Sequence, residues 1–394
     1  MPKVLRIINR FNLGGPTYNV AYLSKYMAPE FDTLLIGGKN GNHEGSSDFI
    51  LKNLGLHSIL IPEMQREINY RNDYLAYQKI KNIIKRWQPD IVHTHATKAG
   101  VLGRLAASRM NIPVIVHTYH GHIYHSYFNK ARTAIYKKID RNLAKKTSMI
   151  IAISDKQKQE LANEHKIAGI ERFNVIPLGF DLERFQTNYN EKRQAFRNKY
   201  KIADDTVAMG IVGRLTHIKN HKLFLDAFAR TKASTHKKIQ AFIIGDGELK
   251  KYLHNHAAKL GLSISNSSEY TPGSDVVFTS WIKHIDRVYP GLDIACLTSV
   301  NEGTPVSIIE AQAANTPVVT TNVGGIENAV IPGKTAMLAK NQNLDDYTEK
   351  LTSMVNDDNL RQKMGAAGWD FVKNNFHYTR LVDDMKTLYN QLLK

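Results

Sequence analysis

Glu302 and Glu310, two glutamates separated by seven residues, are the side chains whose type and spacing most clearly suggest chemistry. Pro305 favours the start of a helix and Thr304 could cap it, so Glu302 falls on the preceding loop and Glu310 inside the helix. Because Glu310 has apolar neighbours, its carboxylate needs hydrogen-bond donors, and hydroxyls of a ribose or a hexose are suitable. An alternative is that Glu310 caps a neighbouring loop. Free N–H groups at the helix start could bind further sugar hydroxyls: those of Gly303, Thr304 and Val306.

Two basic residues follow another apolar run, residues 207–212. Arg214 comes directly after Gly213 at the expected end of a strand, and Lys219 precedes the next amphipathic segment. Two fixed cations there would suit a diphosphate leaving group, because they neutralise the charge that develops as the bond to it breaks. A solvated basic loop is an equally simple interpretation.

A glycine pair near the N-terminus is a third candidate. Gly14 and Gly15 follow an apolar run, and Pro16 favours a helix start directly after them. Glycines let the backbone approach a ligand, and the free N–H groups at a helix N-terminus attract anions such as phosphate. The turn is neither a G-x-G-x-x-G fingerprint nor a Walker A loop, and a purely structural turn is an alternative.

Several histidines lie close together in the sequence. Four of them raise the question of a metal site: His117, His120, His122 and His125. Their spacings mix odd and even steps across the end of a strand, and no carboxylate or cysteine joins them, so we do not predict a metal site. His93 and His95 alternate at another strand end. One of them is expected to lie in the core, and no role is predicted for the other.

The order of apolar and amphipathic segments indicates how these residues are positioned. Short apolar runs alternate with longer amphipathic segments in two successive series, joined by the Pro- and Gly-containing stretch 176–185. This pattern predicts α/β domains with mostly parallel sheets, whose ligands bind at the carboxyl ends of the strands. We expect one domain over residues 1–178, with the C-terminal helix 376–394 packing back on it, and a second over 179–375. The polar stretch 263–274 is expected to be a surface loop.

Composition narrows the class of protein. The 394 residues include 53 Lys and Arg, 36 Asp and Glu and one cysteine, so the formal net charge is +17. A single cysteine excludes a disulfide framework and a Cys-rich zinc module. No apolar run approaches the ~18 residues that cross a membrane, and the N-terminus looks like a first strand. We therefore expect a cytoplasmic protein. Residues 1–180 carry 26 of the basic and 13 of the acidic residues, so most of the excess charge lies in the first half.

The segment Lys130–Lys146 accounts for much of that excess. It holds seven basic residues and one acidic one, and Ile135, Ile139 and Leu143 recur every fourth residue, which predicts one buried face. Such a basic helix is a candidate for an anionic membrane surface, at ~1 kcal/mol per basic residue. A core-facing helix with a solvated basic face is the alternative. Three aromatic residues lie just upstream: Tyr124, Tyr127 and Phe128.

The two glutamates resemble the Glu-x7-Glu motif of the retaining family-4 glycosyltransferases, of the bacterial surface-polysaccharide type. The resemblance implies the GT-B fold, in which two Rossmann-like domains face each other across a cleft. Asn315 stands where many relatives have glycine, but asparagine also tolerates a left-handed helix cap. Other segments match in order along nearly the whole chain: Gly14-Gly15, 89–95, 98–100, 117–122, 176–181, 213–215, 219–220, 245–247, 317–319 and 324–325.

The resemblance implies a role for each matching residue. Arg214 and Lys219 would grip the diphosphate of a nucleotide sugar, and Glu310 would bind the ribose. Glu302 would hold the transferred sugar, and His120 would contact that sugar near the reacting carbon. The implied catalytic residues are therefore His120, Glu302, Arg214 and Lys219. The other implied donor-binding residues are Gly14, Gly15, Gly213, Trp281, Ile282, Gly303, Thr304, Pro305 and Val306, with Trp281 and Ile282 near the base.

The same resemblance implies a reaction and its partners. A hexose-type sugar would move with retention by front-face substitution, in which the leaving phosphate oxygen accepts the proton of the acceptor hydroxyl. No protein nucleophile and no bound metal would be required, and the chain has no Asp-x-Asp sequence. UDP is the expected nucleotide. The expected acceptor is a glycan or a polyprenyl-diphosphate-linked saccharide, reached from the inner face of the plasma membrane.

Two other classes of function are compatible with parts of the sequence. A UDP-sugar 2-epimerase or a phosphorolytic enzyme could share the fold, but the glutamate pair together with Arg214 and Lys219 argues against both. A basic membrane- or nucleic-acid-binding protein without catalysis is the third hypothesis. Nucleic acid is not an expected partner, because the sequence shows no recognisable module and no groove-like interleaving of aromatic and basic residues.

Overall fold

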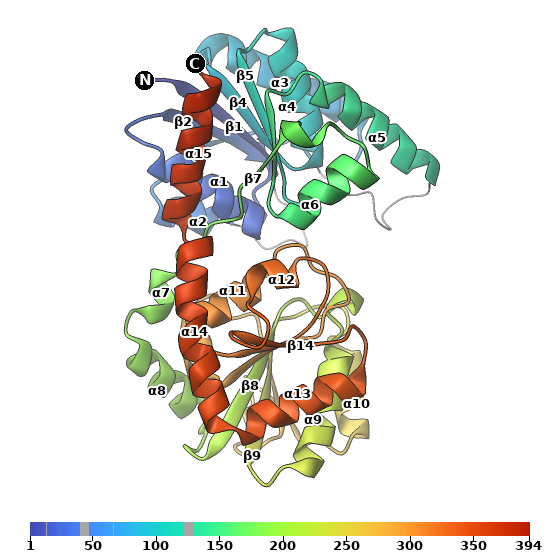
Figure 1. The fold of residues 1–394 in the computed structure, drawn as a ribbon, viewed down its shortest axis with the longest axis vertical. Coiled ribbons are helices and arrows are strands. Elements are labelled where there is room, and N and C mark those ends of the chain that lie inside the picture. The colour runs from blue at the N-terminus through green and yellow to red at the C-terminus, as the bar shows by residue number, and fades with distance from the viewer. Residues whose placement is uncertain (13, 40–46, 66, 122–129) are drawn as a thin grey trace. The chain divides into compact units, whose positions relative to one another are not determined.

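The computed structural model describes residues 1–12, 14–39, 47–65, 67–121 and 130–394. The chain divides into two compact units (Figure 1). Unit 1 comprises Met1–Phe180 and Phe376–Lys394, and unit 2 comprises Asp181–Asn375. Each unit contains a seven-stranded sheet in which every strand pairing is parallel, so the predicted doubly wound α/β class is confirmed.

The sheet of unit 1 has the order β3-β2-β1-β4-β5-β6-β7. Its strands are β1 (Lys3–Arg10), β2 (Asp32–Gly38), β3 (Ser58–Leu60), β4 (Ile91–His95), β5 (Val114–Tyr119), β6 (Met149–Ala152) and β7 (Phe173–Val175). Its helices are α1 (Gly15–Tyr26), α2 (Asp48–Asn53), α3 (Tyr70–Trp87), α4 (Thr97–Arg109), α5 (Lys130–Ala144), α6 (Asp155–Gln159) and α15 (Tyr378–Leu392). Short π- and 3₁₀-helical turns follow α6 at Glu160–Glu164 and Ile170–Arg172.

Two hydrophobic clusters hold helices on this sheet. One joins α3 and α4 to the sheet and includes Ile80 and Ala106. The other joins α15 to β1, β4 and β5 and includes Leu381 and Tyr389. The helix α15 also lies beside α1, so the end of the chain is part of unit 1 (Figure 1). Strands β4 and β5 are thereby covered on both faces.

The sheet of unit 2 has the order β10-β11-β9-β8-β12-β13-β14. Its strands are β8 (Thr206–Val212), β9 (Lys238–Ile244), β10 (Ile264–Asn266), β11 (Val276–Ser280), β12 (Ile294–Leu297), β13 (Val318–Thr321) and β14 (Ala336–Ala339). Its helices are α7 (Glu183–Gln186), α8 (Tyr189–Lys199), α9 (His221–Ser234), α10 (Lys250–Lys259), α11 (Val306–Ala313), α12 (Ile326–Ala329), α13 (Leu344–Asn356) and α14 (Asp358–Phe376). Three 3₁₀ turns connect them at His217–Lys219, Ile285–Arg287 and Tyr289–Gly291.

Three local predictions were wrong. The stretch 263–274 contains a strand, β10, which pairs with β11 at the sheet edge, where polar residues are tolerated. Thr304 does not cap α11, because Pro305 occupies the N-cap position and the helix begins at Val306. Ile135 is 60% exposed although Leu143 is buried, so the buried face of α5 covers only its C-terminal part.

No helix in the described ranges has both the length and the apolar character needed to cross a membrane.

Candidate functional site

The carboxyl edge of the unit 2 sheet brings Lys219 and Glu302 together. Strands β8 and β12 are parallel neighbours, so the segments that follow them meet at one edge. The Lys219 Nζ lies 2.5 Å from the Glu302 Oε1, and the Ser299 hydroxyl donates to the same oxygen over 2.6 Å. Both side chains of the ion pair are largely buried, at 24% and 10% exposed. The sequence predicted both residues for the site but not their direct contact.

Backbone contacts fix the two loops against each other. The Thr298 hydroxyl donates to the carbonyl oxygens of Lys219 and Asn220, and the Val300 N–H donates to the Ile218 carbonyl. A Cβ on Gly324, whose φ is +54°, would lie 1.9 Å from the Glu302 carbonyl oxygen. Glycine is therefore required there, because only its backbone can pack this closely behind the loop.

Arg214 lies on the same edge, after β8, but its guanidinium is exposed. No hydrogen bond or ion pair joins the Arg214 side chain to another residue in the part of the chain that the structure describes. The Gly213 N–H donates to the Ile244 carbonyl, which ties this loop to the end of β9. Arg214 is therefore a cation held near Lys219 by a fixed backbone, without a counter-ion of its own.

The start of α11 lies immediately beyond Glu302. No side chain caps this helix, and its first backbone N–H groups have no intrahelical acceptor. Gly303 is exposed and Thr304 half-buried, so this end of the helix is open to a ligand. The segment can offer an oxygen-rich ligand a favourable helix dipole and the N–H groups of Gly303, Thr304 and Val306, the first helical residue. Pro305, at the N-cap position, has no N–H to donate but helps to fix the backbone of the segment.

Glu310 lies inside α11 and pairs with a residue that the sequence reasoning missed. The Arg184 Nη2 on α7 lies 3.2 Å from the Glu310 Oε1, and the Glu310 side chain is 13% exposed. Burial raises the pKa of Glu310 to about 7, Arg184 opposes that rise, and Asp286 adds to it. No sequence pattern signalled this pair, because 126 residues separate its members.

A polar cluster occupies the carboxyl ends of β9 and β11. Asp246 accepts a hydrogen bond from the Ser280 hydroxyl over 2.9 Å, and Lys250 contacts both residues. The cluster borders a cavity of about 860 Å³. The sequence-predicted residues Trp281 and Ile282 follow Ser280 directly, and Trp281 is 56% exposed. The exposed indole and the adjacent cavity provide room for a flat ring.

Unit 1 gathers its own predicted residues at the carboxyl edge of its sheet. Gly14 is the N-cap of α1, and the N–H groups of Thr17 and Tyr18 donate to its carbonyl. Gly14 and Gly15 are half-buried, so the start of α1 is accessible. Strands β1, β4 and β5 are adjacent, and the glycine turn therefore lies at the same edge as His95 and His120.

A buried histidine network ends at His120. The His95 Nδ1 and His120 Nε2 lie 3.0 Å apart, so the N–H of one ring donates a hydrogen bond to the other ring. His93 contacts the Tyr389 hydroxyl of α15 over 2.6 Å and the Thr118 hydroxyl over 2.8 Å. Burial lowers the pKa of His120 to about 3 and also holds those of His93 and His95 well below the usual value. All three rings are therefore neutral, and both His93 and His95 are core residues.

Two of the four histidines considered as metal ligands lie outside the part of the chain that the structure describes. His122 and His125, together with Tyr124, Tyr127 and Phe128, lie outside the described residues. His117 contacts the Thr94 hydroxyl and packs against Gly100, where a Cβ would lie 2.4 Å from its ring. Within residues 1–12, 14–39, 47–65, 67–121 and 130–394, no group of three or more His, Cys, Asp or Glu could hold a metal ion.

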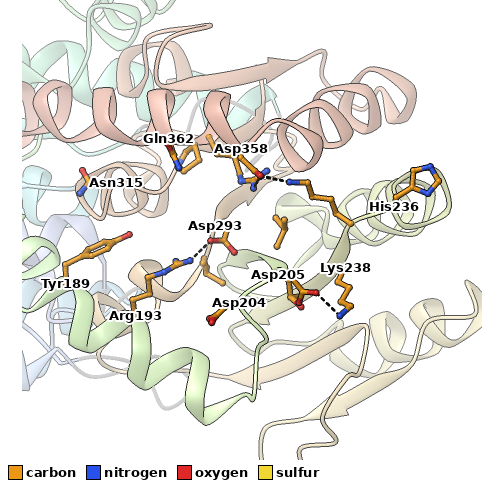
Figure 2. Close-up of a pocket in the computed structure, with 16 residues that line it drawn as sticks. Tyr189, Arg193, Asp204, Asp205, His236, Lys238, Asp293, Asn315, Asp358 and Gln362 are labelled. Atoms are coloured by element: carbon orange, nitrogen blue, oxygen red, sulfur yellow. Dashed lines mark hydrogen bonds and ion pairs between the residues drawn. The ribbon is translucent and has the colours of Figure 1, made fainter.

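A second cavity of unit 2 lies away from these residues. It measures about 740 Å³ and is lined by Thr206, Lys238 and Asp293, which mark the amino ends of their strands (Figure 2). Asp293 is paired with Arg193, and Lys238 with Asp205, so these charges are already compensated. None of the sequence-predicted site residues lines it, and ligands of parallel sheets bind at the opposite ends of the strands.

The paired Rossmann-like units place the protein among GT-B proteins, and solved structures support this class. The structure of Anabaena Alr3699/HepE in complex with UDP aligns with a TM-score of 0.81 over 99% of this chain and 100% of that one, at 18% identity. The structure of WaaG, described as a glycosyltransferase involved in lipopolysaccharide biosynthesis, aligns with a TM-score of 0.71 over 97% and 98%, at 17% identity. At these identities the likeness concerns the fold alone.

Sequence comparison identifies the family. Residues 13–184 match Glycosyltransferase Family 4, and residues 192–370 match Glycosyl transferases group 1. The chain therefore belongs to the glycosyltransferases that these two matches describe, one for each half of the chain. It is 27% identical over 336 residues to the Escherichia coli UDP-Gal:alpha-D-GlcNAc-diphosphoundecaprenol alpha-1,3-galactosyltransferase, covering 85% of this chain and 84% of that protein. It is 26% identical over 346 residues to the Staphylococcus aureus capsular polysaccharide biosynthesis glycosyltransferase CapM, covering 84% of each.

Proposed function

We propose that this glycosyltransferase transfers a hexose-type sugar, with retention, from a UDP-sugar to a lipid-linked or glycan acceptor in surface polysaccharide biosynthesis. The observation that carries the proposal is the contact of Lys219 with Glu302 at the edge where α11 begins, with Arg214 beside it. This edge offers two cations for a diphosphate and two carboxylates for hydroxyl groups. A nucleotide sugar carries both kinds of partner, a diphosphate and sugar hydroxyl groups.

The proposed donor site assigns one part of the donor to each residue. Arg214 and Lys219 bind the diphosphate, with the exposed guanidinium of Arg214 free to form a bidentate contact. Glu310 accepts hydrogen bonds from the ribose hydroxyls. Glu302 accepts hydrogen bonds from the transferred sugar, while the open N–H groups at the start of α11 donate to it. The unit 1 residues His120 and Gly15 keep their implied roles at the sugar and the phosphates.

The proposed reaction is a front-face substitution. The bond between the anomeric carbon and the β-phosphate oxygen breaks, and its electron pair stays on that oxygen. The acceptor hydroxyl attacks the anomeric carbon from the same face and gives its proton to the departing oxygen. Arg214 and Lys219 stabilise the charge that develops on the diphosphate, so neither a protein nucleophile nor a bound metal ion is part of the proposal. The neutral ring of His120 can donate or accept a hydrogen bond at the sugar without adding charge.

Uracil is the proposed base. Two similar proteins support it, since Alr3699/HepE was solved with UDP and the Escherichia coli relative is a UDP-Gal galactosyltransferase. The proposed base position is beside Trp281 and Ile282, next to the cavity that Asp246 and Ser280 border. Thermal-shift measurements with UDP-, GDP- and ADP-sugars test it. UDP-sugars should stabilise the protein most, and a larger shift with GDP- or ADP-sugars would contradict the choice of base.

Two substitutions and a matched control test the chemistry. Lys219→Ala and Glu310→Ala should abolish sugar transfer from the donor that the thermal shift selects, while the melting temperature stays close to that of the wild type. Lys222→Ala is the control, because Lys222 is 49% exposed and its ion pair is with Asp226 on its own helix. Full transfer activity in both site variants would refute the assignment.

A membrane-bound acceptor would give the basic helix α5 a function. Its one acid, Asp140, is turned inward to a buried ion pair with Arg104 over 2.6 Å. Among the described side chains, the exposed charged residues of α5 and the turn after it are therefore all basic: Arg132, Lys138, Arg141, Lys145 and Lys146. The side chain of Lys130 lies outside the description. We propose that this surface binds anionic lipid at the cytoplasmic face of the plasma membrane, where the protein would reach a polyprenyl-diphosphate-linked acceptor.

Liposome flotation tests the lipid contact. The wild type should float with vesicles that contain anionic phosphatidylglycerol and remain in solution with neutral phosphatidylcholine vesicles. Lys138→Glu combined with Lys145→Glu should abolish flotation. A matched double variant in unit 2, Lys251→Glu with Lys259→Glu, changes the net charge equally and should float like the wild type. Equal flotation with both vesicle types would refute the proposal.

A further inference from the structure

The short helix α7 carries Arg184 to the buried carboxylate of α11. The Phe185 side chain is fully buried, and the Gln186 side chain donates to the Ala313 carbonyl at the end of α11 over 2.5 Å. The Lys192 side chain donates to the Arg184 carbonyl over 2.6 Å and fixes the backbone from the other side. Arg184 therefore projects from an anchored turn, although its own side chain is 31% exposed.

The contact between Arg184 and Glu310 engages one carboxylate oxygen. The Arg184 Nη2 lies 3.2 Å from Oε1, and no described residue donates a hydrogen bond to Oε2. The guanidinium also stacks near the Phe185 ring, 4.9 Å from its centroid, which restricts its rotation. One oxygen of Glu310 is thus fixed by an arginine and the other is left for a ligand.

We infer that Arg184 is a positioning residue for donor binding: it orients Glu310 and favours its ionised form, so that the carboxylate can accept hydrogen bonds from the two ribose hydroxyls of the nucleotide. The inference rests on the proposed function, since it presumes that Glu310 meets the ribose. It adds a residue from outside the two-glutamate motif and makes donor binding depend on pH.

The charges around Glu310 determine the direction of that dependence. Arg184 faces it from α7, Asp286 from the turn Ile285–Arg287, and the buried Tyr289 from the following turn. Lys192 of α8 pairs with Asp286 over 2.8 Å and offsets part of its charge. Burial raises the pKa of Glu310 to about 7 and Arg184 lowers it, so loss of Arg184 should raise that pKa further. A protonated carboxyl accepts weaker hydrogen bonds than a carboxylate, and donor binding should weaken as pH falls through this value.

Calorimetric titration with UDP between pH 5.5 and 9 tests the inference, with 2′,3′-dideoxy-UDP as the matched ligand. The two ligands share the base and the titrating diphosphate, so only the ribose contact distinguishes them. For the wild type, the affinity for UDP should fall by up to about tenfold per pH unit below a midpoint near 7. The affinity for the dideoxy compound should change with pH only through the shared diphosphate, so the ratio of the two affinities should show the Glu310 midpoint. This comparison needs no variant.

Two variants separate a positioning role from a structural one. Arg184→Gln should move the midpoint for UDP to higher pH and leave the dideoxy compound unaffected, and Arg184→Lys should restore the wild-type midpoint in part. Equal losses of affinity for both ligands, or an unmoved midpoint, would overturn the inference while UDP binding itself stays intact. Failure of the wild type to bind UDP at any pH would instead overturn the proposed function and the inference with it.

Discussion

Glu302→Gln should increase the affinity of the protein for UDP while it lowers the rate of sugar transfer. In the free protein the Glu302 carboxylate neutralises Lys219, which is the cation proposed to bind the diphosphate. The amide of glutamine keeps the size of the side chain but removes the negative charge. Lys219 then no longer has to leave an ion pair before it contacts phosphate. UDP lacks the sugar that is transferred, so the lost contact between residue 302 and that sugar does not affect UDP binding.

The expected size of this effect follows from the geometry of the pair. Exposed ion pairs contribute ~0.2–1 kcal/mol, and this one lies at the upper end because its side chains are only 24% and 10% exposed and the contact is 2.5 Å. A gain of ~1 kcal/mol corresponds to about a fivefold rise in affinity. Lys219→Met should act in the opposite direction, because a charge-assisted hydrogen bond is worth ~1.5–3 kcal/mol, or about 10- to 150-fold in affinity.

Isothermal titration with UDP at pH 8.5 and low salt measures both changes, at a pH where Glu310 is ionised. Ser299→Ala serves as the control, since it removes the other hydrogen bond to the Glu302 Oε1 without a change of charge. Its affinity for UDP should match that of the wild type. The double variant Lys219→Met with Glu302→Gln should bind like Lys219→Met alone, because Glu302 then has no cation to release. Weaker UDP binding by Glu302→Gln would refute the reasoning.

Three further predictions concern the parts that support the site. Gly324→Ala should lower both the stability of the protein and the rate of sugar transfer. The loss of stability should exceed the ~1–2 kcal/mol that a left-handed alanine costs, because the new Cβ would also meet a carbonyl oxygen at 1.9 Å. Thermal melting measures the first effect and a transfer assay the second. His95→Ala should reduce kcat about fivefold but leave UDP affinity unchanged, because His120 loses a hydrogen bond of ~1 kcal/mol that orients its ring; steady-state kinetics separate the two. Asp140→Ala should destabilise unit 1 by about 3–5 kcal/mol in urea titration, because Arg104 then stays buried without its carboxylate.

Sequence periodicity predicted most of the secondary structure because both sheets are buried on two faces. Strands such as β6 and β12 are apolar throughout and alternate with amphipathic helices, so their places in the sequence are clear. The strand β10 was missed because it lies at an edge, where Ser265 and Asn266 are as acceptable as apolar residues. The exposure of Ile135 was missed because periodicity gives the direction of an apolar face but not the length over which a neighbouring element covers it.

The positions of the candidate site residues could be predicted where they follow a strand, and not where they come from another part of the chain. Lys219 and Glu302 follow β8 and β12, and strand adjacency brings them together. Arg184 comes from the segment expected to be only a connection, and nothing in its neighbours indicates a contact 126 residues away. The Asp246–Ser280 contact was missed for the same reason, since each residue alone is an ordinary turn residue.

The charges of the free site suggest an order for donor binding. Lys219 is neutralised by Glu302, and Arg184 by Glu310, so these cations attract an approaching anion only weakly. The Arg214 side chain has no partner among the described residues and is exposed, so it should make the first contact with the diphosphate. Lys219 would then exchange Glu302 for phosphate, which frees that carboxylate for the sugar hydroxyls. Arg214→Ala should therefore slow UDP association more than dissociation in stopped-flow measurements, whereas Lys219→Ala should mainly accelerate dissociation. The opposite pattern would place Lys219 at the first contact.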